Sequence, residues 1–328
     1  MPENLYDIFS KDGKIPVWFM RQAGRHMPKF QRLVGSRWIT DIVMQPEKAA
    51  EIALEPVEVL GVDASIVFMD ISTPLELLGI KFSFKPGMGP VFEDDIHKLL
   101  DAIDNVDQNK WYLIKEQIGI LKRSKAKVIG FGAGPFTLLS YIIKDDSKDK
   151  VKTKEYIVRN GFFLLDKLKD LLVLEIKHQM DSGADAFQIF DSWAGSLAGS
   201  LMENYVGLLK EAFEAISQQM NRTIYFCRNC NVLLKEIKKT GFSGYLSVDW
   251  NCDLSELYNF YGGKIGLQGN LDPFYAYLGG DVMLKEAKKV LDNVPNKRRY
   301  IFNLGHGVLP GTDFRNLRQL ASFVKSLE

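Results

Sequence analysis

The sequence lacks the excess of cysteine, histidine and basic charge that marks several classes of protein. Three of its 328 residues are cysteine and four are histidine. This odd, sparse set of thiols is no disulfide framework and fits a reducing compartment. Lys and Arg number 42 against 41 Asp and Glu, so the net charge is +1 and no global basic field attracts nucleic acid or an anionic membrane. An anionic ligand must therefore meet a local cluster of positive charge.

Long apolar runs are also missing. No stretch approaches the roughly 20 residues of a membrane-spanning helix. The first residues, Met1 to Leu5, show no basic region followed by an apolar one, so we expect no signal peptide. Apolar residues make up 46% and charged residues 25% of the chain, which is ordinary for a globular protein. We expect a soluble, cytoplasmic protein that binds neither nucleic acid nor membranes.

The sequence does contain a regular alternation of short apolar runs and longer helical segments. The apolar runs, rich in valine, isoleucine or aromatic residues, are typical of strands buried on both faces. They are Pro16–Met20, Ser65–Met69, Lys127–Gly132, Ala186–Phe190, Thr223–Cys227, Tyr245–Val248, Ile265–Gln268 and Tyr300–Asn303. Segments with helical period lie between them, for example at Glu47–Leu60, Lys154–Gln179, Leu201–Gln219, Leu233–Lys239 and Asp281–Leu291.

Eight strand–helix units of about 41 residues each predict a (β/α)₈ TIM barrel. A doubly wound sheet is the alternative. No linker or composition break divides the chain, so we expect one domain over residues 1–328. Pro86-Gly87 and Gly89-Pro90 predict a small hairpin insertion at Phe82–Phe92.

In such a barrel the functional residues lie on the loops that follow the strands. After the first run, Arg21 and Arg25 flank Gln22-Ala23-Gly24. The first 40 residues hold seven basic and three acidic side chains, a local charge of +4 in a nearly neutral chain. Guanidinium pairs bind carboxylates or phosphates, so this segment is either an anion site or a solvated turn.

Single polar residues follow the other strands. Asp70 is a helix cap or a functional residue; Thr73-Pro74 already supplies a cap and a first helical residue, which leaves Asp70 without a structural task. Ser192 lies in Phe190-Asp191-Ser192-Trp193, where Asp or Ser also fits a helix cap. His306 lies between two glycines at a strand end and is poised to donate a hydrogen bond or a proton.

Several other features are given structural interpretations. The alternate glycines of Gly130–Gly134 fit no nucleotide-binding motif, and Tyr141 alone is more typical of a core aromatic. Cys227 and Cys230 form a CxxC that lacks further zinc ligands, so we expect a structural role. His97 and His178 are expected on the surface, and His26 is left open.

Taken together, six motifs resemble the uroporphyrinogen decarboxylase family, in order over nearly the whole chain. They are Pro16–Arg25, Phe68-Met69-Asp70, Gly134-Pro135-Phe136-Thr137 with Tyr141, Phe190–Gly195, Gln268–Pro273 and Asn303–Gly307. The resemblance implies a barrel that forms a homodimer and removes CO₂ from the four acetate side chains of uroporphyrinogen, an octacarboxylate tetrapyrrole, to give coproporphyrinogen. It implies neither a metal nor an organic cofactor.

The resemblance also implies roles for residues. Arg21 and Arg25 meet substrate carboxylates, and Asp70 faces the pyrrole N–H groups as a stabiliser of the transition state. Gln22, Ala23 and Gly24 line the same loop. Tyr141, Ser192 and His306 hydrogen-bond acidic side chains of the substrate. The catalytic set is therefore Asp70, Arg21, Tyr141 and His306, and His306 is an easier proton donor than Arg21 because the pKa of an arginine is very high.

This sequence departs from the family pattern in places. His26-Met27-Pro28-Lys29-Phe30 replaces Tyr-Leu-Pro-Glu-Tyr, and Val34 stands where an arginine is usual, a loss for which Arg32 or Arg37 would compensate. Met69 replaces a serine before Asp70. Two alternatives stay open: a zinc-dependent methyltransferase of the same barrel superfamily, although the chain has no His-x-Cys motif, and a tetrapyrrole-binding protein without catalytic activity.

Overall fold

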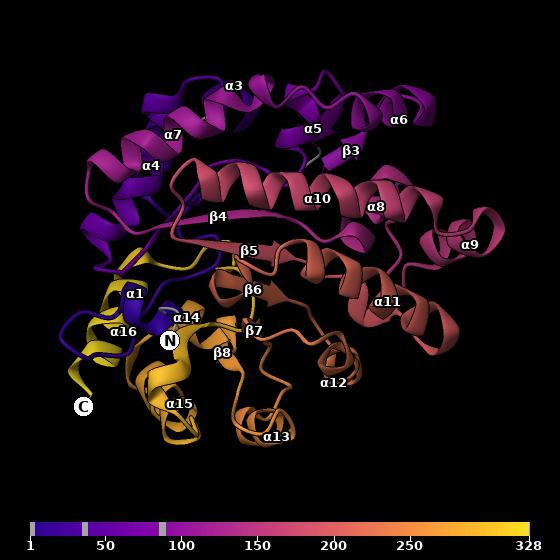
Figure 1. Ribbon diagram of the computed structural model, residues 1–328. Helices are drawn as coiled ribbons and strands as arrows, with labels where there is room; N and C mark the ends of the chain where they lie inside the picture. The colour runs from indigo at the N-terminus through magenta and orange to yellow at the C-terminus, as the bar shows by residue number, and fades with distance from the viewer. Residues whose placement is uncertain (1–3, 35–38, 85–89, 328) are drawn as a thin grey trace.

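A curled sheet of parallel strands forms the centre of the computed structural model, which describes residues 4–34, 39–84 and 90–327 (Figure 1). The strands pair in the order β1-β4-β5-β6-β7-β8-β9, and each neighbouring pair is parallel. Their bounds are β1 Ser65–Ile66, β4 Val128–Ala133, β5 Ala186–Phe190, β6 Thr223–Phe226, β7 Tyr245–Ser247, β8 Gly266–Leu271 and β9 Tyr300–Leu304. Parallel strands all end at the same edge, so the residues that follow them are gathered there.

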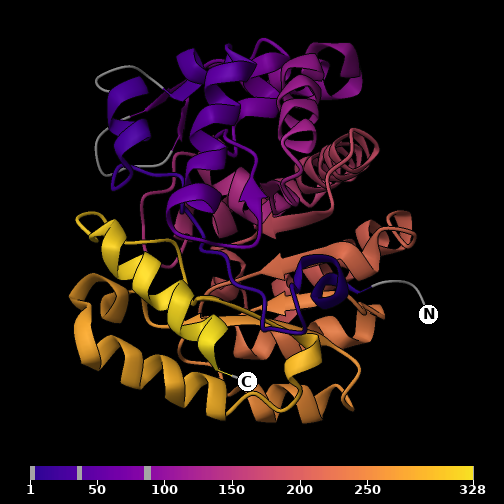
Figure 2. The same cartoon turned by 90° about the vertical axis from the view of Figure 1, so that its left-hand side faces the viewer.

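Helices cover the convex face of the sheet. The longer ones are α4 Pro46–Val59, α7 Tyr112–Arg123, α10 Phe163–Asp181, α11 Gly199–Ala215, α15 Gly280–Asp292 and α16 Phe314–Ser326. Shorter ones are α1 Leu5–Phe9, α2 Pro28–Leu33, α3 Ile39–Val43, α5 Thr73–Leu77, α6 Ile96–Asp104, α8 Pro135–Ile142, α9 Val151–Asn160, α12 Asn231–Ile237, α13 Leu254–Phe260 and α14 Pro273–Leu278. α10 lies along β4 and β5, and α15 packs beside α16 (Figures 1 and 2). Within the described residues no helix is long and apolar enough to cross a membrane.

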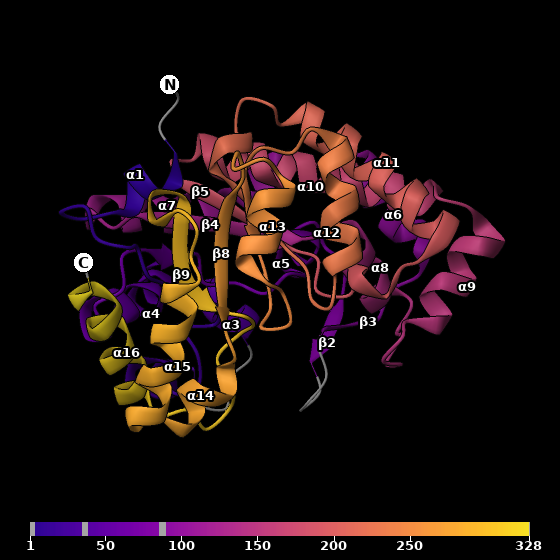
Figure 3. The same cartoon turned by 90° about the horizontal axis from the view of Figure 1, so that it is seen from below.

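The hairpin insertion is present. β2 Phe82–Phe84 pairs antiparallel with β3 Pro90–Phe92, and β3 packs against α8 (Figure 3). The turn at 85–89, where Pro86-Gly87 and Gly89 lie, is outside the described residues. The hairpin therefore stands apart from the parallel sheet, as its proline and glycine content predicts.

The first predicted strand, Pro16–Met20, forms only one parallel bridge, from Val17 to Phe302 of β9. Side chains take the place of the missing ladder. Asp63 Oδ2 accepts from Val17 N at 2.9 Å, and Asn303 Oδ1 accepts from Met20 N at 3.0 Å. On its other side, the Val17 carbonyl accepts from Asp63 N at 2.8 Å, just before β1. The segment therefore lies between β9 and β1 without regular strand pairing.

A polar network crosses the concave interior of the sheet. Trp18 Nε1 donates to Gln268 Oε1 at 2.9 Å, and Gln268 Nε2 donates to Gln188 Oε1 and Ser247 Oγ, both at 2.9 Å. All four side chains are fully or almost fully buried. Because buried polar groups are costly unless bonded, this network fixes the 16–20 segment against β5, β7 and β8.

Two expectations about helical segments are wrong. The predicted helix Lys154–Gln179 is divided into α9 and α10, because Gly161 adopts a left-handed backbone with φ of 74° that ends α9. His178 is half-buried rather than on the surface. Its ring packs edge-on against Trp111 at 5.3 Å, and burial lowers its pKa. His97 is exposed, as expected.

Candidate active site

The turn that carries Arg21 is held in an unusual backbone conformation. Arg21 has a φ of 64°, in the left-handed region that side chains other than glycine rarely adopt. Val308 N donates to Met20 O at 2.9 Å, which ties this turn to the one after β9. A Cβ added to Gly307 would lie 2.5 Å from Arg21 Cδ, so only glycine lets the arginine pack against that backbone. The two turns form one unit.

The neighbours of Arg21 divide into two groups. The Gln22 side chain is fully buried and points into the protein, where Oε1 accepts from Phe19 N at 3.0 Å and Nε2 donates to Ala64 O at 2.8 Å. The Gln22 side chain therefore supports this loop from inside the protein, and the place of Gln22 beside the substrate stays a prediction. Ala23 and Gly24 are partly exposed, and Arg25 is exposed. The structure thus leaves the backbone of 23–24 and the Arg25 side chain open to a ligand.

Asp70 follows β1, and it takes part in local hydrogen bonds. Its Oδ1 accepts from Ser72 N and Ser72 Oγ, each at 3.2 Å, and its backbone N–H donates to Thr73 Oγ1 at 3.0 Å. These bonds form a local turn that corrects the expectation of a spare carboxylate. Burial raises the pKa of Asp70 to about 6, opposed by the Ser72 N–H and, more weakly, by the charge of Arg21. At pH 7 the carboxylate is mostly ionised, poised to attract protons or positive charge.

His306 lies beside two arginines. Burial, together with the charges of Arg21 and Arg228, lowers its pKa to about 4. Its ring also packs edge-on against Phe226 of β6, with centroids 5.7 Å apart. The imidazole is therefore neutral at pH 7 and acts as a hydrogen-bond donor or acceptor. This disfavours His306 as the proton donor.

Tyr141 and Ser192 line one cavity of about 660 Å³ that also contains Trp193, Lys150 and Arg228. Burial raises the pKa of Tyr141, and the charges of Asp70 and Arg21 also act on it, so the phenol faces the central residues. Lys150 Nζ lies 4.0 Å from the centre of the Trp193 ring. The structure thus brings Arg21, Asp70, Tyr141 and His306 within electrostatic reach of one another, with Ser192 beside Tyr141.

Sequence reasoning missed Arg228, Lys150 and Trp193. Arg228 directly follows the predicted strand Thr223–Cys227, so the rule that function lies after strands would have found it. Arg228 lies inside the CxxC motif, and the sequence prediction considered only the two cysteines of that motif. Cys227 and Cys230 are buried beside each other, and burial raises the pKa of both thiols. Among the described residues no three His, Cys, Asp or Glu side chains gather as a metal site would require.

The altered loop forms a helix that is anchored to α4. Met27 and Phe30 are buried, and Lys29 N donates to Glu55 Oε1 at 2.8 Å. Val34 is buried, so it leaves no cation at the usual position of an arginine. Arg32 is exposed and ion-paired to Glu51 at 3.3 Å, and Arg37 lies outside the described residues. The expected compensation by Arg32 is not what the structure shows.

Comparison with known proteins decides the family. The family model described as uroporphyrinogen decarboxylase (URO-D) matches residues 10–327. The chain belongs to the uroporphyrinogen decarboxylase family. It is 38% identical over 317 residues to the uroporphyrinogen decarboxylase of Picrophilus torridus, covering 94% of each chain. It is 36% identical over 325 residues to that of Aquifex aeolicus, covering 96% of this chain and 94% of the other.

Solved structures place the fold of this uroporphyrinogen decarboxylase family member among related α/β proteins. A methyltransferase from Methanosarcina mazei superimposes with a TM-score of 0.76 over 98% of both chains at 20% identity. A B12-independent methionine synthase from Shewanella superimposes with a TM-score of 0.55 at 12% identity. At such identities the likeness concerns the fold alone.

Proposed function

We propose that the protein is a cofactor-independent carboxy-lyase that converts uroporphyrinogen III to coproporphyrinogen III in porphyrin and haem biosynthesis. One observation carries the proposal. In a chain of this family, Arg21 lies within electrostatic reach of Asp70, Tyr141 and His306, although these residues come from separate parts of the sequence. The arrangement combines cations for a polyanionic substrate with a buried carboxylate for a developing cation.

Arg21 and Arg25 would bind substrate carboxylates. In the described part of the chain, the ion pairs of arginine involve Arg32, Arg159 and Arg315, so neither Arg21 nor Arg25 is neutralised by a protein carboxylate. A planar guanidinium offers two parallel hydrogen bonds to such a group. Tyr141, Ser192 and neutral His306 would donate further hydrogen bonds to the acidic side chains.

Asp70 would act on the macrocycle itself. Loss of CO₂ breaks the bond between the carboxylate and the acetate methylene, and its electron pair must be delocalised. A pyrrole protonated at a ring carbon accepts that pair and forms an exocyclic methylene. The methylene then takes a proton to become a methyl group, and the ring carbon gives up the proton it had gained, which restores the aromatic pyrrole. A carboxylate aimed at the pyrrole N–H groups stabilises the cation before the bond breaks. A pKa of about 6 keeps Asp70 ionised for this task at neutral pH.

We further propose that residues 1–328 form a single domain whose sheet closes as an eight-stranded barrel, with the 16–20 segment as the eighth member. The bridge to β9, the hydrogen bonds to Asp63 and the Trp18–Gln268 bond support this closure. The family resemblance supports a homodimer in the cytoplasm. Light scattering of the purified protein measures its molar mass and so tests the dimer.

An anaerobic assay tests the activity. The protein is incubated with uroporphyrinogen III, and the products are oxidised and separated by chromatography. We expect porphyrins with seven, six, five and finally four carboxylates, with and without EDTA. Binding without loss of CO₂ would leave the tetrapyrrole-binding alternative. Activity that is lost on chelation and restored by zinc would revive metal chemistry of the methyltransferase kind.

A further inference from the structure

The turn after β6 holds Arg228 firmly. Cys227 and Cys230 are buried on either side of it. Asn229 N donates to Asp249 Oδ2 at 2.5 Å, and a Cβ added to Gly195 would lie 2.1 Å from the Arg228 carbonyl oxygen. The CxxC segment thus serves as an anchor that presents the Arg228 side chain at the carboxyl edge of the sheet.

The Arg228 guanidinium is poorly satisfied by the protein. Its Nε is buried and has no hydrogen-bond partner among the described residues, where the group also forms no ion pair. It lies 5.7 Å from the centre of the Trp250 ring, a contact that orients a guanidinium without using its N–H groups. A buried donor without an acceptor is unfavourable, so this arrangement calls for an acceptor.

Another unsatisfied donor lines the same cavity. Ser196 Oγ is buried without a hydrogen-bond partner within the described part of the chain, and Ser196 lines the cavity that holds Arg228, Tyr141 and Ser192. Two donors that lack acceptors around one space indicate a ligand that carries acceptor oxygens. A carboxylate has two oxygens and accepts up to four hydrogen bonds.

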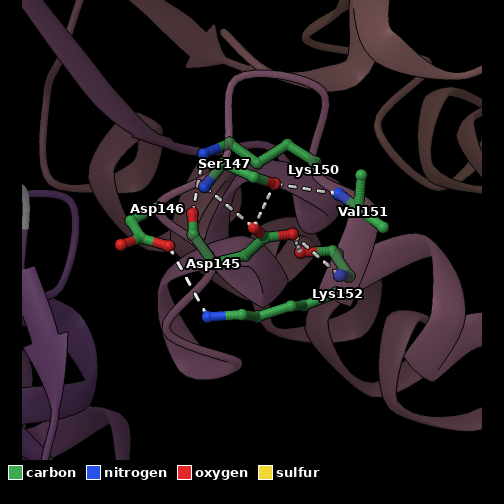
Figure 4. A network of polar contacts seen from close by, with 7 residues as sticks. Asp145, Asp146, Ser147, Lys150, Val151 and Lys152 are labelled. Carbon is green, nitrogen blue, oxygen red and sulfur yellow. Dashed lines mark hydrogen bonds and ion pairs between the residues drawn. The ribbon is translucent and has the colours of Figure 1, made fainter.

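Two of the acidic residues at this cavity, Asp145 and Asp146, have partners of their own. Asp145 is already bonded within its own loop: Oδ1 accepts from Ser147 Oγ at 2.5 Å, and Oδ2 accepts from Thr153 N at 2.8 Å (Figure 4). Asp146 is ion-paired with Lys152 at 3.5 Å. Lys150 Nζ donates to the Asp145 backbone oxygen at 2.7 Å, which leaves its charge uncompensated by a carboxylate contact. Four basic and three acidic side chains line this cavity, so its net charge is +1 with Arg228 included.

Arg228 also reaches the central residues. Its charge lowers the pKa of His306, as the charge of Arg21 does, so both guanidiniums lie within electrostatic reach of the same imidazole. Arg228 thereby joins the cavity of Tyr141 and Ser192 to the turn of Arg21. It therefore lies between these two parts of the site.

We propose that Arg228 is a third carboxylate-binding arginine of the active site, which holds a peripheral carboxylate of the substrate in the cavity lined by Trp193, Ser196 and Lys150. This inference rests on the proposed function. Arg228 would supply a guanidinium that the chain lacks at Val34. A Lys at 228 keeps the charge but loses the fork, so the two properties can be separated.

The test compares Arg228→Met and Arg228→Lys with Arg222→Met and Arg222→Lys. Arg222 directly precedes β6, whereas Arg228 follows it. The two Met variants therefore change the net charge by the same amount at the two ends of one strand, and the two Lys variants leave it unchanged. We expect Arg228→Met to lower kcat/KM for uroporphyrinogen III at least ~10-fold, mainly through KM, and Arg228→Lys to lower it less, whereas both Arg222 variants match the wild type. Equal kinetics for the 228 and 222 variants would overturn the proposal.

A second readout distinguishes binding from structural support. In protein with ¹⁵N-labelled histidine, we expect Arg228→Met to raise the pKa of His306 and Arg228→Lys to leave it near the wild-type value. If both variants disturb His306 equally, Arg228 only supports the turn and the inference fails. If Arg228→Met does not fold, the kinetics of Arg228→Lys against Arg222→Lys decide. Inactivity of the wild type would instead refute the proposed function.

Discussion

Asp70 and Asp191 occupy equivalent places and have opposite surroundings. Each follows a strand of the parallel sheet, and burial raises the pKa of each. Asp191 is fully buried and uses both oxygens: Oδ1 accepts from Thr137 N and Oγ1, and Oδ2 accepts from Tyr205 and Tyr225 at 2.5 and 2.7 Å. Asp70 is partly exposed, and among the described residues only its Oδ1 accepts hydrogen bonds, both from Ser72.

The difference shows what separates a structural carboxylate from a candidate catalytic one. Position after a strand and a raised pKa are common to both residues. Saturation of the oxygens is not, because Asp191 has its acceptor capacity filled by α8, α11 and β6, whereas Asp70 keeps an oxygen for a ligand. Substitution of Asp70 should therefore affect catalysis, and substitution of Asp191 should affect stability.

The largest effect is expected on catalysis. Asp70→Asn removes the charge that would stabilise the cationic pyrrole, and loss of one preorganised group of this kind costs ~10²–10³ in kcat, about 2.7–4 kcal/mol. Anaerobic kinetics measure kcat, and equilibrium binding of coproporphyrinogen, which the remaining arginines hold, should change far less. Asp272→Asn is the control, since Asp272 also follows a strand but caps α14, a task that Asn performs equally well. Near wild-type kcat in Asp70→Asn would refute the mechanism.

Asp191→Asn should act on stability instead. Two buried tyrosines donate to one carboxylate oxygen, and hydrogen bonds to charged groups contribute about 1.5–3 kcal/mol each. We expect the free energy of unfolding in urea to fall by about 3 kcal/mol. Tyr205→Phe and Tyr225→Phe remove one bond each and should cost about half as much. An unchanged unfolding midpoint in all three variants would contradict the structural role.

The third prediction concerns the stability of Asp70→Asn. The pKa of Asp70 is 3.8 in the unfolded chain and about 6 when folded, so protonation favours the folded state. That contribution is present below pH 4 and is lost as the pH rises through 6. At 1.36 kcal/mol per unit, discounted for partial exposure, Asp70→Asn should be about 2 kcal/mol more stable than the wild type at pH 8. Urea unfolding at pH 4.5 and 8 checks this; a variant less stable at pH 8 would contradict it.

The smallest effect is expected for the arginines near Asp70. Arg21→Lys and Arg25→Lys keep the charge but lose the planar fork. Each should stay folded and lose at least ~10-fold in kcat/KM, about 1.4 kcal/mol. Arg32→Lys is the control, because Arg32 pairs with Glu51 on the surface. Wild-type kinetics in both variants would rule out carboxylate binding by these side chains.

Much of the fold follows from local pattern. Buried apolar runs located seven strands of the sheet because burial on both faces requires them. The 16–20 segment deviates because Asp63, Gln22 and Asn303 side chains take its N–H groups, a substitution that no periodicity reveals. The partners of the Gln22 side chain, Phe19 N and Ala64 O, are likewise defined only once the chain is folded.

The site was less accessible from sequence than the fold. Arg21, Asp70, Tyr141 and His306 were found through motifs, and their proximity to one another depends on sheet order. Arg228 and Lys150 become candidate ligand-binding residues only through the unsatisfied donors and the internal hydrogen bonds of Asp145. Both are properties of packing. Residue types indicate which chemistry is available, and packing decides which of those groups are left over for a ligand.

The low pKa of His306 links ligand binding to proton uptake. Burial and two guanidinium charges keep the imidazole neutral. A polyanion seated between those guanidiniums cancels their field, so the affinity of the imidazole for a proton rises when the site is filled. By reciprocity, acidification strengthens binding by the same free energy. The heat of binding therefore depends on the ionisation enthalpy of the buffer, and calorimetry in phosphate and in Tris counts the protons that accompany the ligand.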